Sequence, residues 1–141
     1  MLWGISQAQE KPKLVVGIIV DQMRYDYVYR FWNQFGDNGF KKLVNEGYFL
    51  RNTHYNYTPT YTGPGHASIF TGTTPSVHGI IGNNWYNKAD GLSVYCAGDG
   101  NSNTVCDCDN HIDVESTAGK MSPHRMLTTT FSDELKLFSP Q

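Results

Sequence analysis

The chain has 141 residues, which is about the size of one domain. It is 39% hydrophobic and 17% charged with a net charge of −2, a composition that excludes a disordered tail, a collagen-like repeat and a strongly basic nucleic-acid-binding protein. The longest apolar run, residues 14–20, is much shorter than the ~20 residues that cross a bilayer, so the sequence predicts no membrane anchor.

The first nine residues differ from the rest of the chain. They lack the positive start of a secretory signal, but Ser6 and Ala8 before polar Gln9 resemble a small-residue cleavage site. We interpret residues 1–9 either as the remnant of a signal peptide or as a frayed N-terminus, and residues 10–141 as the domain.

Residues 13–20 are apolar and β-branched, which is typical of a strand buried on both faces of a parallel sheet. Asp21 follows at the carboxyl end, where open α/β sheets place ligand-binding groups. Aromatic residues between 25 and 32 predict a helix, and residues 40–46 predict a second one. Residues 48–53 indicate another strand. Strand, helix and strand in this order predict an α/β fold with a mostly parallel sheet.

The next segment, residues 53–74, is rich in threonine, tyrosine, glycine and proline, so most of it is expected to be loop. Within it, residues 63–71 predict a helix. Pro64 is tolerated in its first turn, and Gly72 is a stop signal.

Farther along, we expect a loop at residues 79–87, anchored by burial of its two aromatic side chains, and a short strand at 93–95. The polar, acidic residues 96–119 indicate a surface excursion, and residues 122–138 fit an amphipathic terminal helix. A parallel sheet needs more strands than these, so we expect a piece of a larger domain, of marginal stability and prone to aggregate.

Thr62 directly precedes the predicted helix, at the N-cap, where unpaired N–H groups attract an anion such as phosphate. The alternative is that Thr62 merely caps the helix. Thr58 and Thr60 are equally available hydroxyl groups, and spacing does not choose among the three.

A threonine hydroxyl is a weak nucleophile that needs a base or a metal ion. His66 lies one turn further along and is a candidate base, although a packed histidine is the commoner case. Asp21 is the better partner, because its hard oxygen can hold a zinc ion against the oxygen of Thr62. The alternative for Asp21 is a helix-capping carboxylate.

Four stretches of the chain carry a resemblance to a known family. They are residues 17–24, residues 60–68, the group Thr71, Gly72 and Pro75, and residues 78–83. Together they closely resemble the alkaline phosphatase superfamily, within it the type I phosphodiesterase/nucleotide pyrophosphatase branch, and most of all periplasmic alkaline phosphatases with a threonine nucleophile. The resemblance runs from about residue 13 to residue 137, and residues 119–123 are similar as well.

The resemblance implies the N-terminal part of an α/β/α sandwich with a mostly parallel, incomplete sheet. It makes Asp21 a zinc ligand, Thr62 the nucleophile and a second zinc ligand, and Asn83 the amide that binds a phosphoryl oxygen. Two zinc ions would clamp the attacking and leaving oxygens. The implied substrate is a small-molecule phosphate ester, in the periplasm or secreted, with no nucleic acid bound.

Departures from the family limit this interpretation. The family takes its other zinc ligands, and the Lys and Arg that hold the phosphate, from a much longer chain, so we expect this piece to be inactive alone. Asp107 and His111 mimic a ligand spacing, residues 99–103 echo a calcium loop, and Cys96 can pair with Cys106 or Cys108. A phosphodiesterase, a non-catalytic phosphate-binding module and an incomplete gene product remain alternatives.

Overall fold

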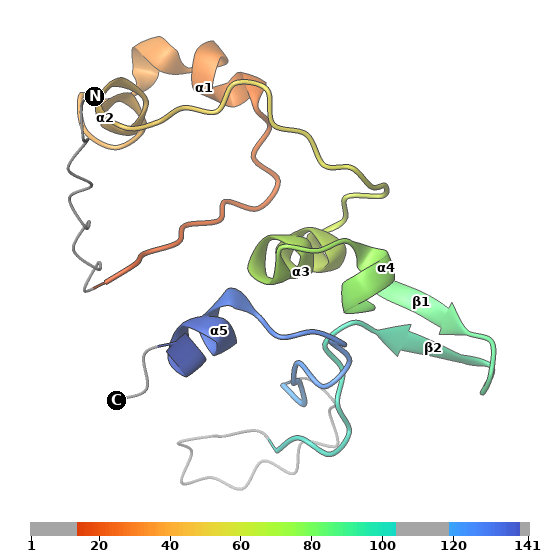
Figure 1. The fold of residues 1–141 in the computed structure, drawn as a ribbon. Coiled ribbons are helices and arrows are strands. Elements are labelled where there is room, and N and C mark those ends of the chain that lie inside the picture. Colours follow the sequence, from red (N-terminus) through yellow and green to blue (C-terminus); the bar gives the residue numbers. More distant parts are fainter. Residues whose placement is uncertain (1–13, 104–118, 139–141) are drawn as a thin grey trace, which may run out of the picture.

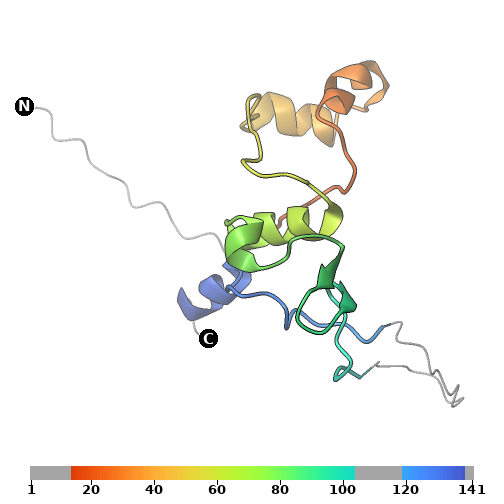
Figure 2. The ribbon, with the colours of Figure 1, turned by 90° about the vertical axis from the view of Figure 1, so that its right-hand side faces the viewer.

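The computed structural model describes residues 14–103 and 119–138. Their elements follow one another in this order: α1 (Asp26–Arg30), a 3₁₀ helix η1 (Trp32–Gln34), α2 (Phe40–Glu46), α3 (Thr62–Thr71), α4 (Pro75–His78), β1 (Asn84–Asn87), β2 (Leu92–Tyr95) and α5 (Phe131–Phe138). Helix α3 lies beside α4 and α5, whereas α1 and α2 lie apart from it, and the segment at residues 47–61 joins α2 to α3 (Figures 1 and 2). None of the helices in the described ranges is long and apolar enough to cross a membrane.

Several predicted helices are confirmed. Helix α2 ends at Gly47, and α3 ends at Gly72, whose φ of 67° is the left-handed conformation that glycine adopts without strain. The helix predicted after Asp21 is present but divided into α1 and η1.

The two strands predicted in the first third of the chain are wrong for the described residues. Residues 14–20 are extended but form no ladder with any described segment, and the side chains of Leu14 and Ile18 are 78% and 80% exposed. Residues 48–53 likewise form no strand. The apolar pattern needs neighbouring strands on which to pair, and residues 14–103 and 119–138 provide none.

A hairpin replaces the loop that we expected at residues 79–87. Strands β1 and β2 pair antiparallel, with Trp85 opposite Val94. The strand predicted at residues 93–95 is thus confirmed within β2, although its partner is antiparallel. The expected burial of Tyr86 is wrong, since its side chain is 65% exposed.

The terminal helix starts later than predicted. Instead of helix, residues 120–122 pair with residues 97–99: Ser122 N donates to Ala97 O at 3.0 Å, and Asp99 N donates to Lys120 O at 3.0 Å. Helix α5 begins only at Phe131, whose ring stacks on Phe70 of α3 at 5.4 Å.

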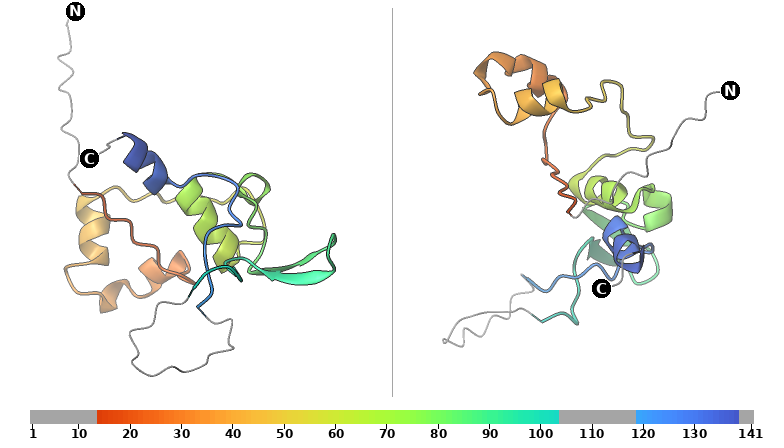
Figure 3. Two further views of the ribbon diagram at one scale, coloured as in Figure 1. Left: turned by 90° about the horizontal axis from the view of Figure 1, so that it is seen from below. Right: turned by 60° about the vertical axis from the view of Figure 1, so that its left-hand side comes forward.

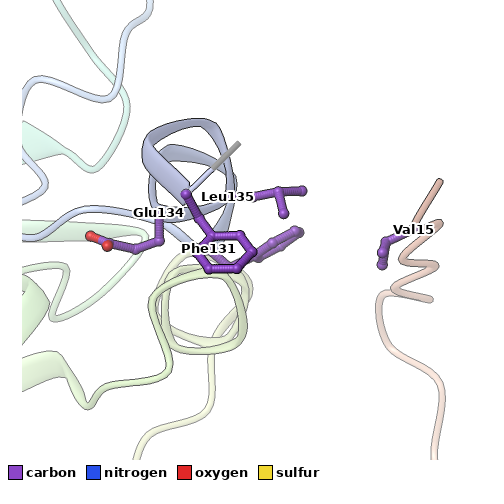
Figure 4. Close-up of a pocket in the computed structure, with 5 residues that line it drawn as sticks. Val15, Phe131, Glu134 and Leu135 are labelled. Atoms are coloured by element: carbon purple, nitrogen blue, oxygen red, sulfur yellow. The ribbon is translucent and has the colours of Figure 1, made fainter. Parts of the chain in front are cut away.

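Little apolar surface is buried in the described ranges. The buried hydrophobic side chains there are Val28, Ala67, Ile80 and Val94, together with the fully buried ring of Pro64. In the left view of Figure 3, residues 14–20 run between the α1/α2 helices and α3, and no described strand lies along them. Val15 lies opposite Phe131 and Leu135 of α5, across a cavity of about 320 Å³ with a mostly apolar lining (Figure 4).

Candidate active site

The structure brings Asp21 and Thr62 together. Asp21 ends the extended residues 14–20, where the chain turns through Gln22, a non-glycine residue in the left-handed region at φ 57°. Thr62 is the first residue of α3. Thr62 Oγ1 lies 3.5 Å from Asp21 Oδ1, although 41 positions separate the two residues.

This distance suits a shared cation better than a hydrogen bond. Strong O–H···O hydrogen bonds are ~2.7 Å long, so 3.5 Å is a weak one. Two oxygens bound ~2.1 Å from one tetrahedral zinc ion are about 3.4 Å apart. Asp21 and Thr62 therefore fit two of the four positions around such an ion.

The two side chains open onto a cavity of about 290 Å³, whose wall also includes Arg24, Tyr55 and His66. Both oxygens are exposed to solvent. A small phosphate ester can therefore reach the hydroxyl group of Thr62.

Asn83 lies at the same end of α3. Its Oδ1 accepts a hydrogen bond of 2.7 Å from Gly63 N. Because a backbone N–H needs an acceptor, this bond fixes the orientation of the amide and leaves Nδ2 as a donor. Nδ2 has no hydrogen bond within residues 14–103 and 119–138. It is available to a phosphoryl oxygen.

The N-terminus of α3 differs in detail from the prediction. Tyr61 is the N-cap residue, and Thr62 is the first helical residue instead of the cap. Gly63 N binds Asn83, Pro64 has no N–H, and Gly65 N donates to Tyr61 O at 2.8 Å. Among the described residues, the N–H left unpaired in this turn is that of Thr62, so one backbone donor is left for an anion, on the nucleophile candidate itself.

His66 is directed at the backbone of Thr62. Its Nδ1 lies 2.9 Å from Thr62 O, a carbonyl oxygen, so this nitrogen is the donor of the hydrogen bond. No hydrogen bond joins His66 to Thr62 Oγ1 in the described part of the chain. His66 is half-buried on the helix surface and not packed in the core.

A buried pair behind the site was missed by sequence reasoning. His78 is fully buried at 0% exposure, and its Nδ1 accepts a 3.1 Å hydrogen bond from Ile80 N. Its Nε2 therefore carries the proton and donates to Ser68 Oγ at 2.9 Å. Burial lowers the pKa of His78, because the charged ring would lose its hydration. This pair fixes α3 against the turn that leads to Asn83, and only the motif at residues 78–83 pointed to it.

The residues that echo a calcium loop have a structural role. The carboxylate of Asp99 accepts hydrogen bonds from Ser122 Oγ at 2.6 Å, Asn101 N at 2.9 Å and Ser102 Oγ at 2.9 Å. These bonds lower its pKa from 3.8 to about 2. Asp99 therefore clamps residues 97–102 to residues 120–124.

Some predicted groups lie outside the described residues: Asp107, His111, Cys106 and Cys108. Within the described ranges, no group of three or more His, Cys, Asp or Glu side chains can hold a metal ion. The oxygens of Asp21 and Thr62 fit part of a zinc site, and its remaining ligands would have to come from elsewhere.

Comparison with known proteins identifies the family. The profile of the family "Type I phosphodiesterase / nucleotide pyrophosphatase" matches residues 15–130. The chain belongs to this family.

Two of the similar proteins are named alkaline phosphatases. The chain is 48% identical over 132 residues to alkaline phosphatase PafA of Elizabethkingia meningoseptica and 48% identical over 131 residues to alkaline phosphatase PhoV of Synechococcus elongatus, covering 94% and 93% of this chain. It spans 23% and 22% of those proteins, which is about a quarter of their length.

A solved structure confirms the fold class. The chain matches the crystal structure of a PafA variant, in which one threonine, one asparagine, one lysine and one arginine are substituted, with a TM-score of 0.80 at 45% identity. The match covers 94% of this chain and 24% of that one. The described residues therefore have the fold of the N-terminal part of an alkaline-phosphatase-like α/β domain.

Proposed function

We propose that this chain is the N-terminal part of a zinc-dependent phosphomonoesterase that acts through a phosphothreonine intermediate. The observation that carries the proposal is the meeting of Thr62 Oγ1 and Asp21 Oδ1, 3.5 Å apart, at the helix end that also holds the Asn83 amide. The proposed nucleophile, metal-ligating carboxylate and phosphate-binding donor thus meet at the N-terminus of α3.

In this proposal Thr62 Oγ1 forms a bond to phosphorus as the alcohol leaves, and water then releases phosphate from Thr62. The N–H of Thr62 and Nδ2 of Asn83 donate to the oxygens of the transferring phosphoryl group, where negative charge is spread. Since Asn83 is already oriented by Gly63, little reorganisation is needed when the ester binds.

Asp21 and Thr62 would together hold one zinc ion. When bound, zinc would favour the ionised form of the Thr62 hydroxyl and offset the charge of the phosphate. Without the ion, Asp21 makes a weak 3.5 Å hydrogen bond with the Thr62 hydroxyl group, and both residues line the cavity.

The PafA variant supports the two site assignments. The threonine and the asparagine substituted in that protein are the same number of positions apart as Thr62 and Asn83. This agreement supports a shared pair of functional residues. By the same reasoning, we propose a small phosphate ester as the substrate and the periplasm or the cell exterior as the location.

A phosphodiesterase or nucleotide pyrophosphatase is the second candidate, because the matching family carries that description. The described residues include the nucleophile and the amide, but not the downstream Lys and Arg that we expect to select monoesters. The test must therefore compare both ester classes.

The sharpest experiment replaces the corresponding quarter of PafA with this chain and measures zinc-dependent hydrolysis of an aryl phosphate and of a bis-aryl phosphate. We expect Thr62→Ala to lower kcat by about 10³-fold or more, and Asn83→Ala by about 10²-fold. Thr58→Ala is the matched control and should retain activity. Undiminished hydrolysis by the Thr62→Ala chimera would remove Thr62 from the nucleophile role, and faster diester turnover would favour the second candidate.

The chain alone should show no zinc-dependent hydrolysis of the aryl phosphate, because two oxygen ligands hold zinc only weakly. Turnover that depends on Thr62 in the isolated chain would contradict this expectation.

A further inference from the structure

Gly63 contacts the phosphate-binding candidate Asn83 directly. It is the second residue of α3, and its N–H donates to Asn83 Oδ1 at 2.7 Å. Any residue except proline can make such a bond through its backbone, so the hydrogen bond does not explain why glycine occupies this position.

The space around Gly63 explains why glycine occupies this position. A Cβ atom built there would lie 3.1 Å from Asn83 Oδ1, 3.1 Å from Cys96 Sγ and 3.2 Å from Gly82 O. These separations are shorter than ordinary van der Waals contacts, so at least one neighbour would have to move. The same construction at Gly65, in the same turn of α3, meets nothing within 4 Å.

The three neighbours of Gly63 differ in how easily they could move away from an added Cβ atom. Gly82 O belongs to a tight turn, in which a Cβ at Gly82 itself would lie 2.9 Å from Asn84 O. Cys96 is tied to the same turn, since its N–H donates to Asn83 O at 2.9 Å. The Asn83 amide is the group that can rotate away most easily.

We propose that Gly63 is a positioning residue for Asn83. Its N–H sets the direction of the amide. Asn83 Oδ1, Cys96 Sγ and Gly82 O surround the place that a Cβ of residue 63 would occupy, so only glycine leaves the amide in this position. The proposal rests on the proposed function only in giving Asn83 a phosphate to bind.

The test compares Gly63→Ala with Gly65→Ala in the whole chain. Alanine is the better helix former at both positions, so the two variants gain similar helix propensity and differ in what the new methyl group meets. The readout is the pair of Asn83 side-chain NH₂ signals in a ¹⁵N–¹H spectrum without phosphate, assigned by their loss in Asn83→Ala. We expect Gly63→Ala to shift or broaden this pair and Gly65→Ala to leave it in place.

Unmoved Asn83 signals in Gly63→Ala, or equal movement in both variants, overturn the proposal. A second variant, Cys96→Ala, covers the case in which Gly63→Ala does not fold. It removes the sulfur that crowds the Cβ position of residue 63, so Gly63→Ala made in that background should disturb the Asn83 pair less than it does alone. Equal disturbance of the pair by Gly63→Ala in both backgrounds contradicts the proposal.

Titration with inorganic phosphate separates this proposal from the proposed function. Gly63→Ala should weaken binding by about tenfold or more, and Gly65→Ala should not change it, because a misdirected Nδ2 loses a hydrogen bond to a charged group. Failure of phosphate to move any Asn83 signal in the unsubstituted chain would count against the proposed function, while the phosphate-free comparison would still decide the role of Gly63.

Discussion

Two regions of the molecule are held together by different means. The helix–hairpin region, residues 62–99 with 120–127, is cross-linked by directional contacts between polar groups, such as Ser68 with His78 and Asp99 with Ser122. The leading region, residues 14–53, consists of an extended apolar segment and short helices joined by ring contacts such as Tyr25 on Phe49. The helix–hairpin region is held in shape by hydrogen bonds within itself. The leading region exposes apolar surface that its own residues do not cover.

The candidate site lies where the two regions meet. Thr62 and Asn83 belong to the helix–hairpin region, whereas Asp21 ends the uncovered segment of the leading region. We therefore expect two kinds of effect. Substitutions in the helix–hairpin region should lower the free energy of unfolding, whereas substitutions in the apolar segment, residues 14–20, should change solubility instead.

The largest effect should come from His78→Ala. The substitution leaves Ser68 Oγ and Ile80 N without partners and opens a cavity, which together should lower the free energy of unfolding by about 3 kcal/mol. Urea unfolding monitored by tryptophan fluorescence measures this loss. The control is His54→Ala, at an exposed side chain, which should change the free energy by less than about 0.5 kcal/mol. Equal effects of the two changes would contradict the comparison.

The same histidine predicts a pH dependence. Its pKa is lowered in the folded state, so the unfolded chain binds the proton more readily. The stability that the neutral ring contributes is present above pH ~6.5 and declines as pH falls below that value. This decline should be absent in His78→Ala when urea midpoints are compared between pH 8 and pH 5.

A smaller effect is expected for Asp99→Asn. Because the folded pKa is about 2 against an ordinary 3.8, the carboxylate contributes stability that is present above pH 3.8 and is lost as pH falls toward 2. The amide introduced by the substitution would keep one acceptor oxygen and turn donors toward Ser122 or Ser102. Acid titration of both proteins, followed by circular dichroism, should show this component in the unsubstituted chain alone. If the unsubstituted chain and Asp99→Asn unfolded at the same acid pH, Asp99 would not be the residue that clamps these segments.

The smallest effect on stability is expected for Ile18→Lys. Ile18 is 80% exposed, so the urea midpoint should hardly move, with a change within about 0.5 kcal/mol. Light scattering at rising concentration should show less aggregation, because a charge interrupts an exposed, unpaired apolar segment. Val94→Lys, at a buried residue of β2, is the matched control and should unfold the hairpin.

Helices with local signals were predictable from the sequence. Gly72 and Pro64 mark the ends of α3, and Gly47 marks the end of α2, because these residues act through their own backbone. The hairpin was missed because Asn84–Asn87 has polar residues at its ends and no apolar alternation. The strand expected at residues 13–20 failed for the opposite reason: its pattern is clear, but pairing depends on segments that the described residues do not contain.

The site was predictable in its residue types and only partly in its contacts. The motifs singled out Asp21, Thr62 and Asn83, which the structure brings to one end of α3. Spacing carries no information on the bond from Gly63 to Asn83 or on the burial of His78, because both depend on how the turn at residues 78–83 packs against the helix.

The bond between Gly63 and Asn83 has one more consequence. It joins the Thr62 hydroxyl group and the Asn83 amide through one hydrogen-bonded piece of backbone, while the Asp21 carboxylate belongs to a different segment. Displacing the opening segment would then spoil cation affinity and leave anion affinity nearly intact, so the two would vary independently from one homologue to the next.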